Sequence, residues 1–200
     1  MERALADAGA RVVVSDEPSV IAAADGVVLP GVGSFGDAMA YLRASGQAEA
    51  LLSAVGRGAP FLGICLGLQL LFERGNETDD GSWAAGLGVL AGSATRLESA
   101  RLKVPHVGWD QLHLTERGRA CPLFSGVPEG ANVYFTHSYA LADDVDEAVV
   151  AARTHYVRSF ASAVWDGRAV FGVQFHPEKS SAVGGVILAN FARVVGEAGR

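Results

Sequence analysis

The sequence predicts an α/β domain in which a mostly parallel central sheet carries added antiparallel strands in the C-terminal half. In the first half, short β-branched and apolar runs alternate with helical patterns, as expected of parallel strands buried between helices. In the second half, strand patterns follow one another, and two of them flank Asp166-Gly167, a dipeptide that favours a tight two-residue hairpin turn. The length of 200 residues, without a repeat or linker, predicts a single domain over 1–200.

The N-terminal half is predicted to contain three strands separated by helices. It begins with the end of a helix over 2–8, which Gly9 would close. Short runs bounded by turn residues indicate buried strands, and longer periodic stretches indicate helices. The expected strands span 11–15, 26–29 and 61–64; the expected helices span 19–24, 37–55 with a break near Ser45-Gly46, and 66–74; a glycine-rich loop spans 30–36.

The C-terminal half is predicted to be mainly β structure followed by one long helix. Its expected strands span 132–141, 149–153, 160–165 and 168–176. The helix spans 181–195, and Ser180 or Ser181 is available as its N-terminal cap.

Composition and charge exclude several classes of protein. Half of the residues are hydrophobic and 19% are charged, which is typical of a globular protein. The net charge of -6 disfavours binding to nucleic acid or to an anionic membrane. Two cysteines, no long apolar run and no signal-peptide layout at the N-terminus favour a soluble protein of the cytoplasm.

The strongest local feature is Gly63-Ile64-Cys65-Leu66-Gly67, which lies between a predicted strand and a predicted helix. This is the setting of a nucleophile elbow, with cysteine in the place of serine. Cys65 would lie at a helix N-terminus, which favours the thiolate, and the N–H of Leu66 would face a developing oxyanion. From these five residues alone, a buried structural cysteine is an equally good interpretation.

A second feature, Gln174-Phe175-His176-Pro177-Glu178, ends a predicted strand. Residues two apart on an extended segment point to the same side, so Glu178 can orient the imidazole of His176. A lone histidine near a strand end is more often structural, but a same-face glutamate and a cysteine elbow favour catalysis. The order of nucleophile, histidine and acid differs from that of the α/β-hydrolases.

Together these two segments resemble the class I glutamine amidotransferases, which use a Cys-His-Glu triad. GICLGLQLLF matches their nucleophile motif and GVQFHPEKS matches their His-Pro-Glu motif, in the family's order and wide spacing. The resemblance covers nearly the whole chain. It implies a three-layer, flavodoxin-like fold and a glutaminase that needs no cofactor. Because Cys121, His113 and His155 are isolated, no metal site is expected either.

Two further segments are similar to the glutaminase subunits of imidazole glycerol phosphate synthases, which serve histidine biosynthesis. PGVGSFGD over 30–37 looks like their oxyanion strand, and PHVGWD over 105–110 departs from their usual pattern at Val107 and Asp110. The resemblance implies a heterodimer with a (β/α)8-barrel cyclase, which receives the ammonia. A glutaminase for another synthase remains the alternative.

The resemblance also assigns roles to single residues. Besides the triad, it implies a second oxyanion donor in Val32–Gly33, and glutamine contacts from Gln69, His137, Ser138 and Tyr139. Tyr134 and Lys179 match positions near the subunit contact, and Trp109 is a candidate interface anchor. Without the motif, Gln69 would be taken as a solvated helix residue. For Trp109 burial in the core is nearly as good an interpretation, and for Lys179 a solvated surface role is the alternative.

The beginning of the chain departs from the family pattern. Family members open with a strand, whereas this sequence begins within the helix that follows it. The first strand is therefore expected to be missing, which would leave backbone groups unpaired and a gap in the core. This leaves open a third hypothesis, a non-catalytic domain that binds partners.

Overall fold

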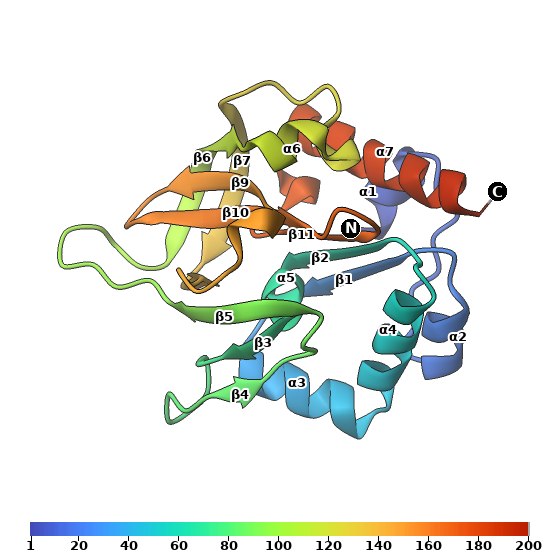
Figure 1. Cartoon of the computed structure of the whole chain (residues 1–200), viewed down its shortest axis with the longest axis horizontal. Helices are drawn as coiled ribbons and strands as arrows, with labels where there is room; N and C mark the ends of the chain where they lie inside the picture. The colour runs from blue at the N-terminus through green and yellow to red at the C-terminus, as the bar shows by residue number, and fades with distance from the viewer. Residues whose placement is uncertain (200) are drawn as a thin grey trace.

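The structure, a computed structural model, describes residues 1–199 and has helices on both faces of a central sheet (Figure 1). The N-terminal part contains these elements: α1 Glu2–Asp7, α2 Pro18–Ala23, β1 Val27–Gly31, α3 Phe35–Ala44, α4 Gln47–Gly56, β2 Phe61–Cys65, α5 Leu66–Leu70, β3 Phe72–Gly75, β4 Ala84–Ala85 and β5 Leu90–Arg96. The C-terminal part contains β6 His106–Leu114, α6 Glu116–Ala120, β7 Ala131–His137, β8 Tyr139–Leu141, β9 Val150–His155, β10 Ser159–Trp165, β11 Val170–Val173 and α7 Ser181–Ala198, with short 3-10 turns η1 Pro122–Phe124, η2 Glu147–Val149 and η3 Pro177–Lys179.

The central sheet has seven strands in the order β1-β2-β11-β10-β9-β6-β7. β2 pairs in parallel with β1 on one side and with β11 on the other, whereas the remaining neighbours are antiparallel. The α/β class and the antiparallel C-terminal strands are thus confirmed, but the sheet is mixed rather than mostly parallel. This pairing places the carboxyl end of β2, which carries Cys65, beside the carboxyl end of β11.

Each face of the sheet has its own hydrophobic cluster. On one face, Leu62 and Ile64 of β2 pack with α1 and α7, and on the other Phe61 packs with α3 and α4. The alternation follows from the two-residue period of a strand. In Figure 1, α1 and α7 lie above β1 and β2, and α2, α3 and α4 lie below them. The expected three layers are confirmed.

The helix α7 is, in the part of the chain that the structure describes, long and apolar enough to cross a membrane by length and composition alone. Its buried side chains, Ile187, Leu188 and Phe191, instead belong to the cluster on one face of the sheet. Its other face carries Arg193 and Glu197, which form an exposed ion pair at 3.0 Å. We therefore interpret α7 as a core helix of a soluble domain.

Several predicted elements are correct within a few residues, and others need correction. The helices over 2–8 and 19–24, the break at Ser45-Gly46 and the strand over 61–64 correspond to α1, α2, the junction of α3 and α4, and β2. The run Arg11–Ser15 joins no strand of the described chain, and Val13 and Val14 are 64% and 76% exposed. β-branched composition does not make a strand where no neighbour pairs with it.

The helix predicted over 66–74 ends at Leu70, and Phe72–Gly75 forms strand β3. Residues 66–72 are all buried, so their periodicity could not distinguish a helix from a strand. Pairing with β5 decides the conformation: β3 enters a second sheet, of order β4-β3-β5-β8.

Corrections in the C-terminal half also come from tertiary pairing. The strand over 132–141 is two strands, β7 and β8, in different sheets. The strand over 168–176 is shortened to β11, and Trp165 pairs with Phe171, so the turn at Asp166-Gly167 is longer than two residues. Strands β5 and β6 were not expected. Ser180 precedes α7, but its side chain forms no cap and has another role described below.

We expect Gly67→Ala to lower the free energy of unfolding by about 3 kcal/mol or more. A Cβ at Gly67 would collide with the carbonyl oxygen of Leu29, because α5 crosses β1 in backbone contact. Chemical denaturation measures the change. The control is Gly185→Ala in α7, where a Cβ meets no other described atom within 4 Å and should stabilise the helix by up to about 1 kcal/mol. Equal stability of the two variants would contradict the close packing of α5.

Candidate active site

Cys65 lies at the sharp turn between β2 and α5, in a backbone conformation that side-chain-bearing residues rarely adopt. Its φ is 55° and its ψ is -110°. The turn is possible because Gly63 and Gly67 approach each other so closely that a Cβ at Gly63 would collide with the backbone of Gly67. The predicted elbow is therefore present, and it aims the sulfur at the carboxyl edge of the sheet.

His176 and Glu178 follow β11 and face the same edge. Nδ1 of His176 lies 2.9 Å from Oε1 of Glu178. The segment is fixed from the side by Tyr134 of β7, whose carbonyl accepts from the His176 N–H at 2.9 Å and whose N–H donates to Ser180 Oγ at 3.0 Å. The Ser180 hydroxyl in turn donates to the His176 carbonyl at 2.6 Å. Ser180 thus anchors the histidine instead of capping α7.

The electrostatics of this pair favour a protonated imidazole. Burial alone would lower the pKa of His176, but the neighbouring Cys65 sulfur and Glu178 raise it to about 9. Burial would raise the pKa of Glu178, yet the hydrogen bond from His176 and its charge hold that pKa below its usual value. Within residues 1–199, Nε2 of His176 is buried and completes no hydrogen bond, so it is available to a reacting group.

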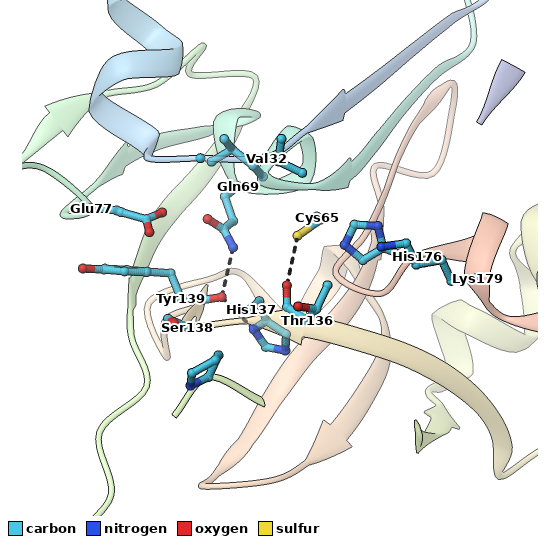
Figure 2. A pocket seen from close by; sticks show the side chains of 13 residues that line it. Val32, Cys65, Gln69, Glu77, Thr136, His137, Ser138, Tyr139, His176 and Lys179 are labelled. Carbon is cyan, nitrogen blue, oxygen red and sulfur yellow. Dashed lines mark hydrogen bonds between the residues drawn. The ribbon is translucent and has the colours of Figure 1, made fainter. Parts of the chain in front are cut away.

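A cavity of about 400 Å³ opens beside the sulfur, a volume suited to a small metabolite. Figure 2 shows Cys65 and His176 at one end of it and Glu77 and Tyr139 at the other. All residues expected to hold glutamine or to form the oxyanion site line it: Val32, Gly33, Leu66, Gln69, His137, Ser138 and Tyr139. The sequence motifs thus meet in one pocket, although they come from four regions of the chain.

His137 lines the pocket as a neutral, structural side chain. Burial lowers its pKa to about 3, although a hydrogen bond to the Tyr139 carbonyl opposes this shift. Its Nδ1 lies 2.8 Å from that carbonyl oxygen, and its Nε2 lies 3.1 Å from Nδ1 of His106. A carbonyl can only accept, so Nδ1 carries the proton. His137 therefore fixes the backbone of Ser138 and Tyr139 at the pocket wall.

Gln69 is buried rather than solvated. Its Nε2 donates to the Tyr139 carbonyl and to Gln174 Oε1, both at 3.0 Å. Its amide therefore connects α5 with the opposite wall of the pocket.

Glu77 is a pocket residue that the sequence patterns did not reveal. Burial raises its pKa, and an N–H from Phe35 partly offsets the shift. It lies in a loop without a recognisable motif, so no local signal could identify it. A partly buried carboxylate opposite the nucleophile can bind the ammonium group of an amino acid.

The three residues predicted near a subunit contact lie together, and one of them, Lys179, lines the pocket. The rings of Trp109 and Tyr134 pack edge to face with centroids 6.0 Å apart, and Lys179 Nζ lies 5.9 Å from the Tyr134 ring. Trp109 is 53% exposed, so it is not a core residue. With Val107, also exposed, it presents an apolar surface next to the site. No group of metal-ligating side chains occurs among residues 1–199.

Comparison with known proteins connects this pocket to a family. The family model of class I glutamine amidotransferases matches residues 1–194. The chain belongs to this family. It is 46% identical over 199 residues to imidazole glycerol phosphate synthase subunit HisH of Moorella thermoacetica, covering 100% of this chain and 90% of that protein. It is 47% identical over 190 residues to the HisH subunit of Geobacter metallireducens, covering 92% and 87%.

Solved structures have the same fold at much lower identity. A putative GMP synthase protein from Thermoplasma acidophilum superposes with a TM-score of 0.71 at 20% identity, covering 98% of this chain and 86% of that chain. The glutaminase domain of CTPS from Trypanosoma brucei, with bound acivicin, gives 0.64 at 16% identity, covering 96% and 86%. At these identities the likeness concerns the fold of class I amidotransferases.

For this amidotransferase, we expect kcat/KM for glutamine to fall as the pH rises through about 9, where His176 loses its proton. Glu178→Gln keeps the shape but removes a charge that raises the pKa of His176, so the alkaline limb should move to lower pH. Rates of glutamate release across the pH range give the position of the alkaline limb in the unmodified chain and in Glu178→Gln. Glu197→Gln, exposed on α7, is the matched control. An unmoved limb in Glu178→Gln would show that the carboxylate does not support the imidazolium.

Proposed function

We propose that this amidotransferase is the glutaminase subunit of an imidazole glycerol phosphate synthase and supplies ammonia for histidine biosynthesis. One observation carries the chemistry: a single pocket holds Cys65 and His176 at one end and the carboxylate of Glu77 at the other. The span suits glutamine, whose reactive carboxamide and α-amino group lie at opposite ends of the molecule. Because the two hydrophobic clusters share β2, we infer that residues 1–200 act as one domain.

The reaction begins when the sulfur of Cys65 attacks the side-chain carboxamide carbon of glutamine. The thiol proton resides on His176, whose raised pKa favours the imidazolium. The C–S bond forms as the carbonyl π electrons move to oxygen. When the tetrahedral intermediate collapses, the C–N bond breaks, His176 protonates the departing nitrogen, and ammonia leaves a glutamyl thioester.

Hydrolysis of the thioester uses the same groups in reverse. Neutral His176 removes a proton from water, whose oxygen attacks the thioester carbon. The C–S bond then breaks, and glutamate and the Cys65 thiolate are released. Glu178 holds the imidazole at Nδ1 in both steps, so that Nε2 faces the reacting atoms.

The oxyanion that forms in each half-reaction requires hydrogen-bond donors close to Cys65. Leu66 opens α5, and the first N–H groups of a helix have no partner within that helix, so its N–H is one donor. The second donor belongs to the Val32–Gly33 segment, which borders the pocket. Gly33 has a φ of +96°, a conformation that glycine adopts without strain.

The remainder of glutamine is held at the far end of the pocket. Glu77 binds the α-ammonium group by charge. The backbone of Ser138 and Tyr139, fixed by His137, contacts the α-substituents, and Gln69 closes the wall beside them.

The partner is a (β/α)8-barrel cyclase that binds over Trp109, Tyr134 and Lys179. Tryptophan and tyrosine often dominate the energetics of interfaces. In this group Trp109 is exposed, and Lys179 lines the pocket. Ammonia can then pass from the site into the covered interface without reaching bulk water. The protein is expected to work in the cytoplasm, where its two free cysteines remain reduced.

Adding the barrel cyclase should raise glutamate release by at least about tenfold, because an ungated glutaminase would waste glutamine. Cys65→Ser should abolish the activity, by about 10⁴-fold or more. Cys121→Ser, at a buried cysteine that does not line the pocket, is the control and should keep the rate. No response to the cyclase would favour a glutaminase for another synthase. Failure of a glutamine-like electrophile to label Cys65 would favour a non-catalytic partner-binding domain.

Glu77→Gln should raise the KM for glutamine by about tenfold or more while kcat changes little, because a charged hydrogen bond made in ground and transition states alike is lost. Steady-state kinetics of the cyclase complex measure both constants. Asp80→Asn, in the same loop but on the surface, serves as control. A kcat defect with unchanged KM would place Glu77 outside the glutamine-binding site.

A further inference from the structure

Gln174 is completely buried two residues before His176, and its amide reaches the sulfur of Cys65. Its Nε2 lies 3.7 Å from Sγ, and its Oε1 accepts from Gln69 Nε2 at 3.0 Å. A buried amide without partners is costly, so both ends of this side chain are held by their contacts. The catalytic cycle described above uses His176 and Glu178 but not this amide.

The direction of these hydrogen bonds is fixed by a backbone carbonyl. The Tyr139 carbonyl can only accept, so the group of Gln69 that faces it, at 3.0 Å, must be the NH₂. That NH₂ has a second hydrogen, which points to Gln174 and requires an oxygen there. The NH₂ of Gln174 must therefore face the sulfur. The assignment follows from chemistry even though oxygen and nitrogen of an amide have similar shapes.

A donor aimed at sulfur favours the anionic form of the nucleophile. An N–H donates to a thiolate much more strongly than to a neutral thiol, because hydrogen bonds to charged groups are the strong ones. Another polar neighbour of the sulfur, the Thr136 carbonyl at 3.9 Å, can only accept from a thiol. Gln174 thus opposes the preference of that carbonyl for the protonated sulfur.

We propose that Gln174 is a catalytic residue of this site: its Nε2–H donates to the Cys65 sulfur whenever that sulfur is anionic. This occurs before attack on glutamine and again when the thioester C–S bond breaks and the thiolate leaves. Gln69 is a positioning residue, since it holds the amide of Gln174 in the orientation that presents NH₂. The inference rests on the proposed glutaminase function but concerns the sulfur, not the choice of pathway.

The test is the pH dependence of Cys65 alkylation by iodoacetamide in the full chain, followed by peptide mass spectrometry to separate Cys65 from Cys121. Gln174→Leu and Gln174→Met remove the donor while keeping the volume. We expect the midpoint of alkylation to move up by about one pH unit, and the rate below it to fall about tenfold, as loss of one charged hydrogen bond implies. Gln69→Leu should shift the midpoint in the same direction by less.

Gln47→Leu is the matched control, because Gln47 is a nearly buried glutamine of α4 outside the pocket. It should alkylate like the unmodified chain, whereas a general loosening of the fold would affect both sites. Thermal unfolding confirms that each variant is folded. An unchanged midpoint in folded Gln174→Leu or Gln174→Met would overturn the inference.

A measurement on the unmodified chain covers the case in which both variants fail to fold. The side-chain NH₂ resonances of Gln174 should titrate with the same midpoint as alkylation of Cys65, and resonances that do not titrate would overturn the inference. Failure of the proposed function is separately visible. In that case the cyclase would not stimulate glutamate release, whatever the alkylation midpoint of Cys65.

Discussion

The backbone contact between α5 and β1 determines how the site is built. Gly67 lies against the carbonyl of Leu29 with no space for a side chain, and a Cβ at Gly63 would likewise collide with the backbone of Gly67. The helix can therefore begin immediately after the strand, and Cys65 must occupy the bend between them. Because β2 is an interior strand, with β1 and β11 paired on its two sides, this bend is fixed by the sheet itself. Both the nucleophile and the N–H of Leu66 obtain their positions from this packing.

The second half of the site is fixed by hydrogen bonds rather than by close packing. Tyr134 and Ser180 hold the backbone of His176, while His106 and His137 hold the wall formed by Ser138 and Tyr139. β7 takes part in both sets, so a displacement of this strand would move the imidazole and the pocket wall together. Tyr134 also contacts Trp109 and Lys179, and Lys179 lines the pocket. A protein bound to these residues would therefore contact β7, the strand that positions both the imidazole of His176 and the pocket wall.

The sequence was sufficient to predict the α/β class, the elbow and the His-Glu pair, because each depends on local patterns. Glycines at fixed offsets from Cys65 predict a tight strand-to-helix turn, and the two-residue period at His176 predicts a carboxylate on the same side as the imidazole. Features that depend on distant partners were not predictable. Phe72–Gly75 is a strand only because β5 pairs with it, and Arg11–Ser15 is not one because no described strand does.

The same distinction applies within the site. Gln69 and Lys179 were identified through motifs, whereas Glu77 has no motif and reaches the pocket through the tertiary fold. Ser180 looked like a helix cap, a role that short polar residues before helices commonly have, but its hydroxyl serves the His176 carbonyl. Sequence patterns indicate which reactive side chains are present, whereas the tertiary structure determines which atoms those side chains contact.

The conformation of Cys65 has a consequence for the evolution of such chains. At a φ of 55° and ψ of -110°, a residue with a side chain costs about 1–3 kcal/mol, which a glycine would recover. At this position, the stability of the fold favours glycine, whereas catalysis requires cysteine. A homologue that no longer produces ammonia but still binds its partner would gain stability from glycine at this position. Glycine in place of the cysteine would therefore indicate a member of the family without glutaminase activity.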